Sequence, residues 1–210
     1  MDQFHKDVYD FILDLFTSDV KKKKAKKLLI EAKGFFKEQA SKKYPCYHQC
    51  YEGGLADHTA LVCLEGYHSV ITKPWCGVDP DDMLIVGLFH DLDKVGLYMK
   101  EFTRIAHNDK ETIFHVEKYG LRSNETQDGI ILAHGGWAGL GEPSLRGITH
   151  PPIAVYAHAA DMFASHVTKT MVETRNRIRE IMAAILGIVV PKEDLDDFEK
   201  HILIRRLEVG

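Results

Sequence analysis

The sequence predicts an all-α fold. Along most of the 210 residues, apolar side chains recur at intervals of three and four, which is the spacing that places them on one face of a helix. The alternation of apolar and polar residues that indicates strands is scarce, and no segment repeats along the chain. With 45% hydrophobic residues, a chain of this length can bury one sizeable core, so a single domain over residues 1–210 is expected.

Two helices are expected in the N-terminal part, residues 1–43. Residues 2–16 carry an apolar stripe of valine, isoleucine, leucine and phenylalanine at helical spacing. In residues 21–39 the leucines and phenylalanines share one side, and lysines cover the rest. Tyr44 and Pro45 then interrupt the pattern.

Glycine, proline and capping residues mark the remaining helices. We expect one helix after Gly53-Gly54, one over residues 81–91 capped near residues 79–81, one from Ser123 or Asn124 through His134, one starting at Pro151-Pro152, one over residues 171–188 and one over residues 191–207. The first four belong to a core part, residues 44–168. The last two form a C-terminal part, residues 169–210.

Charge, cysteine content and hydropathy argue against several classes of protein. The formal net charge of -4 and the pI near 6.3 give no overall attraction to nucleic acid, so such binding would need a local basic patch. The four cysteines come without an apolar secretory signal at the charged N-terminus, so reduced thiols and a cytoplasmic location are expected. No apolar run approaches the roughly 20 residues that span a bilayer, so no membrane association is expected.

The stretch GLFHDLDKVGLY, residues 87–98, places polar side chains inside an otherwise apolar segment. Burying an unpaired carboxylate such as that of Asp91 is costly, and a metal ion would compensate for it. Histidine and carboxylate together suit Mn, Fe, Co, Ni or Zn. The candidate ligands, in chain order and in apolar or small-residue surroundings, are His58, His90, Asp91, His115, His134 and Asp161.

Five motifs follow one another over residues 44–168: YHQCYEGGLADHTALV, GLFHDLDKVGLY, IFHVEKYG, GIILAHGGW and PIAVYAHAADMFAS. With these motifs in this order, the chain resembles the HD-domain metal-dependent phosphohydrolases. The resemblance implies an HD-domain helical bundle, here with additional N- and C-terminal helices. It also implies one or two divalent ions (Mn, Fe, Co, Ni, Zn or Mg). His58, His90, Asp91 and Asp161 would surround the first ion, and His115 and His134 would join a bridging Asp91 at the second.

The resemblance also implies catalytic and substrate-binding roles. Asp91 would bridge the ions and position the attacking water, and Lys94, which shares a side with His90 and Asp91, would hold a phosphate oxygen. Lys118, next to Glu117, matches a position that either supports the ligands or touches the substrate. His48 and His158 also match positions where relatives carry histidine. The resemblance implies a pocket residue at His48 and a reserve ligand at His158, and a structural hydrogen bond is the alternative for each.

Several polar residues match nothing in that family. Asp93 replaces a small residue, and we expect it to face solvent because positions i and i+2 lie on opposite sides of a helix. The remaining histidines are expected at the surface or in helix caps: His5, His68, His107, His150, His166 and His201.

Three further features leave alternatives open. The lysine run at residues 21–27 either attracts polyanions or, as we prefer, forms a solvated helix face. Cys46 and Cys50 resemble a zinc knuckle, but small packing residues are preferred because their spacing is unlike a structural zinc site. In the glycine-rich segment after His134, Trp137 either stacks on a base or fills the core, and Arg146 binds either a phosphate or Glu142.

The sequence therefore predicts a phosphohydrolase that cleaves a phosphoester of a nucleotide, of the nucleotidase or deoxynucleotide triphosphohydrolase type. A small nucleotide is preferred because exoribonuclease relatives carry an added nucleic-acid-binding domain that this chain lacks. A 3'-5' exoribonuclease or a cyclic-nucleotide phosphodiesterase is the alternative, and a non-catalytic nucleotide or metal sensor is the alternative of another class. The base, sugar, cleaved bond, native metal and oligomeric state stay open.

Overall fold

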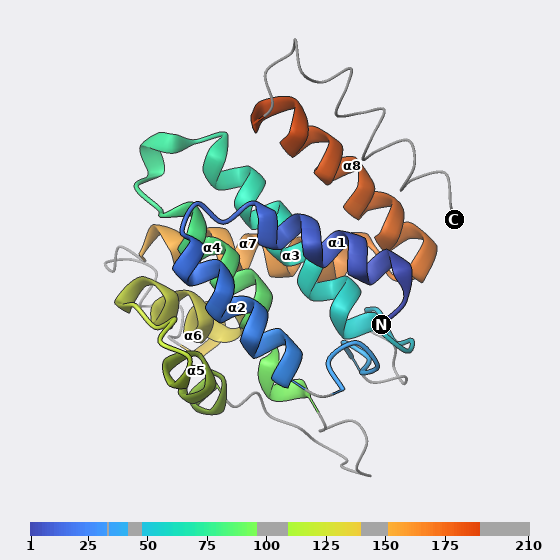
Figure 1. Cartoon of the computed structure of the whole chain (residues 1–210), viewed down its shortest axis with the longest axis horizontal. Coiled ribbons are helices and arrows are strands. Elements are labelled where there is room, and N and C mark those ends of the chain that lie inside the picture. Colours follow the sequence, from blue (N-terminus) through green and yellow to red (C-terminus); the bar gives the residue numbers. More distant parts are fainter. Residues whose placement is uncertain (33, 42–47, 96–108, 140–150, 190–210) are drawn as a thin grey trace.

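The computed structural model describes residues 1–32, 34–41, 48–95, 109–139 and 151–189, without the side chains of 134–139, 167 and 189. Within these ranges all regular structure is helical, which confirms the predicted all-α fold (Figure 1). No helix in the described ranges is long and apolar enough to cross a membrane.

The first two helices are present as predicted, although the second is shorter than expected. α1 (Gln3–Asp14) begins at Asp2, whose carboxylate accepts a hydrogen bond from a backbone N–H of the first turn. α2 (Asp19–Glu31) ends well before residue 39. The chain turns at Gly34, whose φ of 97° is a conformation that glycine adopts readily, so the apolar periodicity beyond α2 belongs to a turn rather than a helix.

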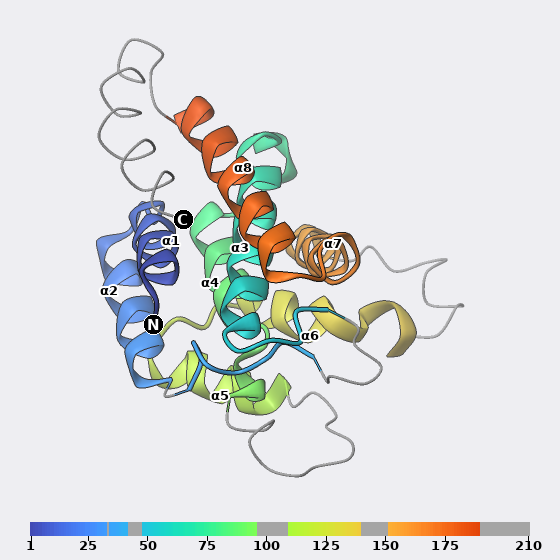
Figure 2. The same cartoon turned by 90° about the vertical axis from the view of Figure 1, so that its right-hand side faces the viewer.

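α3 (Gly54–Ile71) is the central helix, and it begins at the predicted glycine pair. It packs against α1, α4 (Pro80–Phe89), α7 (Pro152–Val167) and α8 (Met171–Val189). Figure 2 shows α1 and α2 on one side of α3 and α7 on the other. Buried side chains of α3 therefore contact residues from segments that are distant in the sequence.

α3 and α4 approach each other closely at a glycine. A Cβ atom added to Gly87 would lie 2.4 Å from the Cα of Cys63, so only glycine permits this contact. α4 begins at Asp79, which caps the helix as predicted, and ends at Phe89. A short 3-10 helix, η2 (Leu92–Lys94), follows it.

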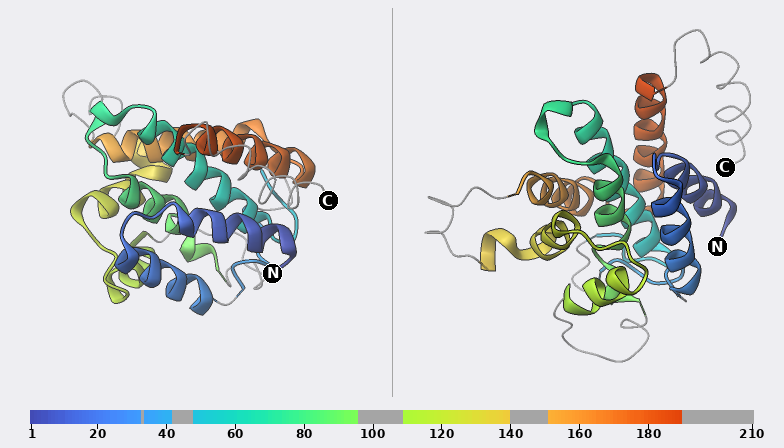
Figure 3. Two further views of the ribbon diagram at one scale, coloured as in Figure 1. Left: turned by 45° about the horizontal axis from the view of Figure 1, so that its top comes forward. Right: turned by 60° about the vertical axis from the view of Figure 1, so that its left-hand side comes forward.

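The later helices begin close to the predicted positions. The hydroxyl of Ser123 caps α6 (Asn124–Gly139), α7 starts at the proline pair, and α8 covers the predicted residues. Three helices of the described residues were not predicted: α5 (Asp109–Lys118) and the 3-10 helices η1 (Pro74–Cys76) and η2. The helix expected over residues 191–207 lies outside the described residues. Figure 3 shows α6 and α7 together on the side opposite α1 and α2.

The lysine run takes part in packing between helices. The ammonium of Lys21 lies 2.8 Å from carboxylate oxygens of both Asp79 and Asp82, at the start of α4. These ion pairs connect α2 to α4, which favours the interpretation of residues 21–27 as a helix face over that of a polyanion-binding patch.

The cysteines differ in part from the expectation of reduced thiols. Cys63 and Cys76 are free, but Cys50 is disulfide-bonded, which contradicts that expectation for this residue. A sulfur atom in a disulfide is not a thiolate ligand, so Cys50 does not serve a zinc knuckle. Cys46 lies outside the described residues.

Candidate metal centre

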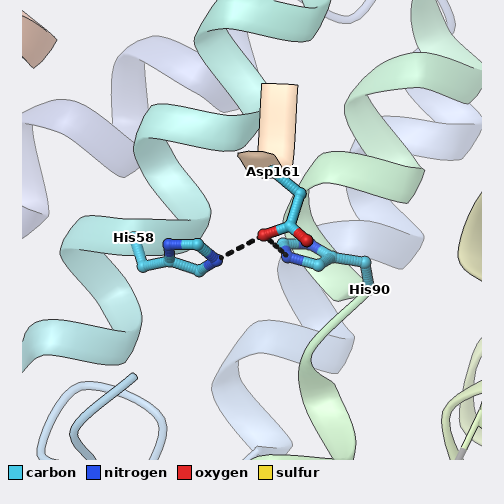
Figure 4. A group of neighbouring side chains, drawn as sticks. All are labelled: His58, His90 and Asp161. Carbon is cyan, nitrogen blue, oxygen red and sulfur yellow. Dashed lines mark ion pairs between the residues drawn. The ribbon is translucent and has the colours of Figure 1, made fainter. Parts of the chain in front are cut away.

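Three side chains that are distant in the sequence converge in the interior. His58 lies in the first turns of α3, His90 directly follows α4, and Asp161 projects from α7 (Figure 4). One ligand atom from each lies within 4.8 Å of the other two. Both histidines are fully buried, and Asp161 is 8% exposed. The two imidazoles and the carboxylate form a candidate site for a metal ion.

Asp91 brings a second carboxylate to this group, which we call the His–Asp cluster (His58, His90, Asp91 and Asp161). Its Oδ2 lies 3.4 Å from Nε2 of His58 and 3.6 Å from Nε2 of His90. Nε2 of His58 lies 3.1 Å from Oδ1 of Asp161, and Nε2 of His90 lies 3.9 Å from the same oxygen. Two ligands about 2.1 Å from a tetrahedral ion lie about 3.4 Å apart, so these separations are close to those around one ion.

A backbone hydrogen bond orients His90. Its Nδ1 lies 3.0 Å from the carbonyl oxygen of Gly87, and because a carbonyl only accepts, Nδ1 must carry the proton. In the neutral ring, Nε2 then presents its lone pair to the carboxylates. This is the arrangement that positions a histidine to bind a metal, and it depends on the backbone of the last turn of α4.

His58 has polar atoms that the protein leaves without hydrogen bonds. Both of its ring nitrogens are buried and neither makes a well-formed hydrogen bond, although Nε2 lies 3.1 Å from Oδ1 of Asp161. Buried nitrogen atoms are almost always satisfied in folded proteins, because an unsatisfied polar group carries its full desolvation cost. A cation bound to Nε2 would compensate for one of them, so the residues present are compatible with a metal ion.

Lys94 adds a positive charge to the edge of the cluster. Its Nζ donates a hydrogen bond of 2.6 Å to Oδ2 of Asp91, and both side chains are buried. The expectation that Lys94 and Asp91 share one side of the chain is thus confirmed. Asp91, Asp161 and Lys94 together carry one net negative charge when the imidazoles are neutral, and the buried Asp93 of η2 is a further carboxylate next to Lys94 in the chain.

His48 lies beside the cluster, although it is not one of the converging ligands. Its ring centroid is 4.9 Å from that of His58, with the two planes tilted by 33°. Burial lowers the pKa of His48 to about 3, and His58 and Lys94 act in the same direction. His48 is therefore a neutral imidazole at neutral pH, at the place where the sequence predicts a pocket residue.

The expected second-ion ligands are not part of the described cluster. His115 lies on α5 and lines a cavity of about 320 Å³ together with Leu92, Val95, Lys118 and Tyr119. His134 lies on α6, but its side chain is outside the described residues, as is that of Trp137. Arg146 also lies outside them.

His158 makes the structural hydrogen bond that is its alternative interpretation. Its Nδ1 lies 2.7 Å from the carbonyl oxygen of Ala133 and joins α7 to α6.

Asp93 is only 4% exposed, so the expectation that it faces solvent is wrong. The reason is that η2 lies in the interior, where a turn has no solvent-facing side.

His5 is also buried, contrary to the expectation of a surface or capping residue. Its Nε2 lies 2.7 Å from Oδ1 of Asp57, the residue before His58. The other oxygen of Asp57 accepts hydrogen bonds from the hydroxyl of Tyr51 and from Nε of Arg175 on α8. These contacts join α1, α3 and α8 next to His58, and no local sequence pattern indicates them because the partners lie far apart along the chain.

Comparisons of the chain with models of protein families, with curated proteins and with solved structures find no match. The resemblance to HD-domain hydrolases therefore remains a prediction that rests on the sequence motifs.

Proposed function

We propose that this chain is a metal-dependent phosphohydrolase that cleaves a phosphoester bond of a nucleotide. The observation that carries the proposal is the convergence of His58, His90 and Asp161 from three different helices, with ligand atoms within 4.8 Å of one another. Buried charged groups are costly unless they are paired or coordinate a metal ion, so a cation would compensate this group. The order of the motifs in the sequence supports phosphoester hydrolysis as the reaction.

The charge of the region supports an anionic substrate. Without a cation, Asp91, Asp161 and Lys94 together carry one net negative charge. A divalent cation would offset this negative charge, in a region that excludes most solvent. A phosphate group would then be attracted to the site, and its developing charge would be stabilised there.

The chain's own residues divide the chemical work. When bound, a divalent cation lowers the pKa of water toward about 7 and polarises the phosphoryl group. His58, His90 and Asp161 would hold the cation, and Asp91 would orient the attacking water by accepting a hydrogen bond from it. An ammonium has three N–H donors, so Lys94 can donate to Asp91 and to a phosphoryl oxygen together.

The cavity beside η2 supports a small nucleotide rather than a long polymer as the substrate. Its volume of about 320 Å³ is at the lower end of the range for pockets that bind small molecules. Leu92 and Val95 line it and belong to the same short turn as Asp91 and Lys94. Its polar lining is mixed: His115 and Lys118 can meet a sugar or a phosphate, and Glu31 and Glu111 add two carboxylates.

A hydrolysis screen tests the proposal. Nucleoside mono-, di- and triphosphates, cyclic nucleotides and short RNA are incubated with the protein and Mn, Co, Ni, Zn or Mg. We expect metal-dependent release of product from a single nucleotide, and we expect His90→Gln and Asp91→Asn to lower the rate at least about 100-fold while folding is retained. His166→Phe, at an exposed position of α7, is the control.

The products separate the proposal from its alternatives. Free phosphate or intact triphosphate identifies a nucleotidase or a triphosphohydrolase, whereas shortened RNA or an opened cyclic nucleotide identifies the exoribonuclease or the phosphodiesterase. Absence of turnover with every metal, together with tight binding of a nucleotide or metal, would support the sensor and contradict the proposal.

A further inference from the structure

His48 presents a buried polar atom that no role assigned so far explains. Its Nε2 is shielded from solvent and has no hydrogen-bond partner, while its ring packs on that of His58 at 4.9 Å. Phenylalanine would make the same ring contact without burying a nitrogen atom. Packing alone therefore does not account for a histidine at this position.

The backbone next to His48 is held in an unusual conformation. Gln49 has a φ of 36°, in the left-handed region that residues other than glycine rarely adopt. Such residues persist only where the surroundings enforce them, and they concentrate at functional sites. The peptide carbonyl of Gln49 also lies so close to Gly54 that an added Cβ there would be 2.1 Å from the carbonyl oxygen. The segment is therefore pressed against the start of α3, the helix that carries His58.

The side chain of Gln49 fixes this segment to the helices that carry Asp161 and its neighbours. Its amide nitrogen lies 3.0 Å from the carbonyl oxygen of Ala164 on α7 and 2.8 Å from that of Thr168. The backbone carbonyl oxygen of Gln49 accepts a hydrogen bond from the backbone N–H of Ala40. The left-handed backbone and the buried side chain of Gln49 thus hold the neighbouring His48, whose imidazole packs on that of His58.

We propose that Nε2 of His48 hydrogen-bonds an oxygen of the phosphate group that binds at the His–Asp cluster. This inference rests on the proposed function and adds a substrate contact to it. Because His48 packs on His58, it lies next to the cation-binding atoms without occupying a ligand position. A phosphate bound there would give Nε2 the partner that the protein itself does not supply.

Phosphate binding to Mn²⁺-loaded protein tests this contact without requiring turnover. Isothermal titration measures first the affinity for Mn²⁺ and then that for inorganic phosphate. We expect His48→Phe, which retains the ring contact, to weaken phosphate binding at least about 10-fold and to change Mn²⁺ affinity less than about 3-fold. His48→Gln, which keeps an N–H donor, should retain more of the phosphate affinity. His166→Phe is the control, and thermal unfolding establishes that each variant is folded.

Three results would overturn the inference. The first is a phosphate affinity that is unchanged in His48→Phe. The second is a loss of Mn²⁺ affinity together with phosphate affinity, which would make His48 a metal ligand and not a phosphate contact. Wild-type protein could also bind Mn²⁺ but no phosphate. If phosphate binding depends on His48 while no nucleotide is hydrolysed, the inference holds and the proposed hydrolase activity fails.

Discussion

At the scale of single residues, the Asp91–Lys94 pair shows how a buried carboxylate of the cluster is stabilised without a bound cation. Asp91 is completely buried, and Lys94 is 6% exposed. Removing one partner of a buried ion pair leaves a charge without compensation, which is much more costly than losing an exposed pair. A cation bound beside Asp91 would supply the same compensation from another direction.

We predict that Lys94→Met destabilises the metal-free protein by about 3 kcal/mol, because the Asp91 carboxylate stays buried without its ammonium. Mn²⁺ should recover part of this loss, so the increase in Tm on adding Mn²⁺ should be larger in Lys94→Met than in wild type. Chemical denaturation with and without Mn²⁺ measures both effects. An equal Mn²⁺ effect in the two proteins would contradict the placement of a cation next to Asp91.

The residues of the cluster were predictable, whereas their supporting contacts were not. His58, His90, Asp91 and Asp161 stand out in the sequence as polar residues in apolar surroundings, in an order that resembles a known family. Asp93 has the same appearance, and its burial depends on where the short helix η2 lies, which the local pattern does not specify.

At the scale of helices, Asp57 connects three elements through one carboxylate. It is fully buried and binds His5 of α1 and Arg175 of α8, as well as Tyr51. Because Asp57 precedes His58, these contacts hold the first turn of α3 and therefore the position of one candidate ligand.

Replacing Arg175 with methionine should lower the free energy of unfolding by about 2–3 kcal/mol, because Asp57 loses its charged partner in a buried setting. The matched control is Arg177→Met, two residues further along α8. Arg177 is 37% exposed and pairs with Glu65 and Glu180, so its loss should cost less than about 1 kcal/mol. Urea denaturation compares the two, and equal losses would show that burial of Asp57 does not set the cost.

The close contact of α3 and α4 gives a second prediction at this scale. Gly87→Ala should destabilise the protein by about 1–3 kcal/mol, since the added methyl group overlaps Cys63 and forces the helices apart. It should also weaken Mn²⁺ binding, because the carbonyl of Gly87 orients His90. Gly187→Ala, on α8 with nothing within 4 Å of the new Cβ, should instead stabilise by about 0.5–1 kcal/mol. Denaturation and Mn²⁺ titration of both variants check this, and a Gly87→Ala protein with wild-type Mn²⁺ affinity would contradict it.

Most helix starts follow from local chemistry, and the failures have physical causes. Asp79, Ser123 and the proline pair at 151–152 mark helix starts because they satisfy or avoid the free N–H groups of the first turn. α5 was missed because only two of its residues, Thr112 and Val116, are buried, so its apolar stripe is weak. The end of α2 depends on the left-handed turn at Gly34, which periodicity does not report.

At the scale of the whole molecule, the cluster lies where α3, α4 and α7 meet, so a bound cation would connect segments separated by about 100 residues of chain. Such contacts exist only in the folded state. A ligand that binds only this state stabilises it by mass action. The contacts His5–Asp57 and Gln49–Ala164 are equally long-range, which is why no local pattern predicts them.

We predict that Mn²⁺ at about 100 times its Kd raises the free energy of unfolding of wild-type protein by about 2.7 kcal/mol. Asp161→Asn keeps the size of the side chain but removes its charge, so the same Mn²⁺ concentration should have little effect on this variant. Ser165→Ala removes only a hydroxyl that lies 3.4 Å from Asp161 and is the control. Thermal unfolding with Mn²⁺ and with a chelator measures the difference, and equal stabilisation of Asp161→Asn and wild type would place the ion elsewhere.

The most direct test is an anomalous difference map from a crystal grown with Mn²⁺. We expect a peak about 2.0–2.3 Å from Nε2 of His58, Nε2 of His90 and a carboxylate oxygen of Asp161. A peak at another position, or a well-ordered His–Asp cluster with no peak beside it at saturating Mn²⁺, would contradict the assignment of these residues as metal ligands.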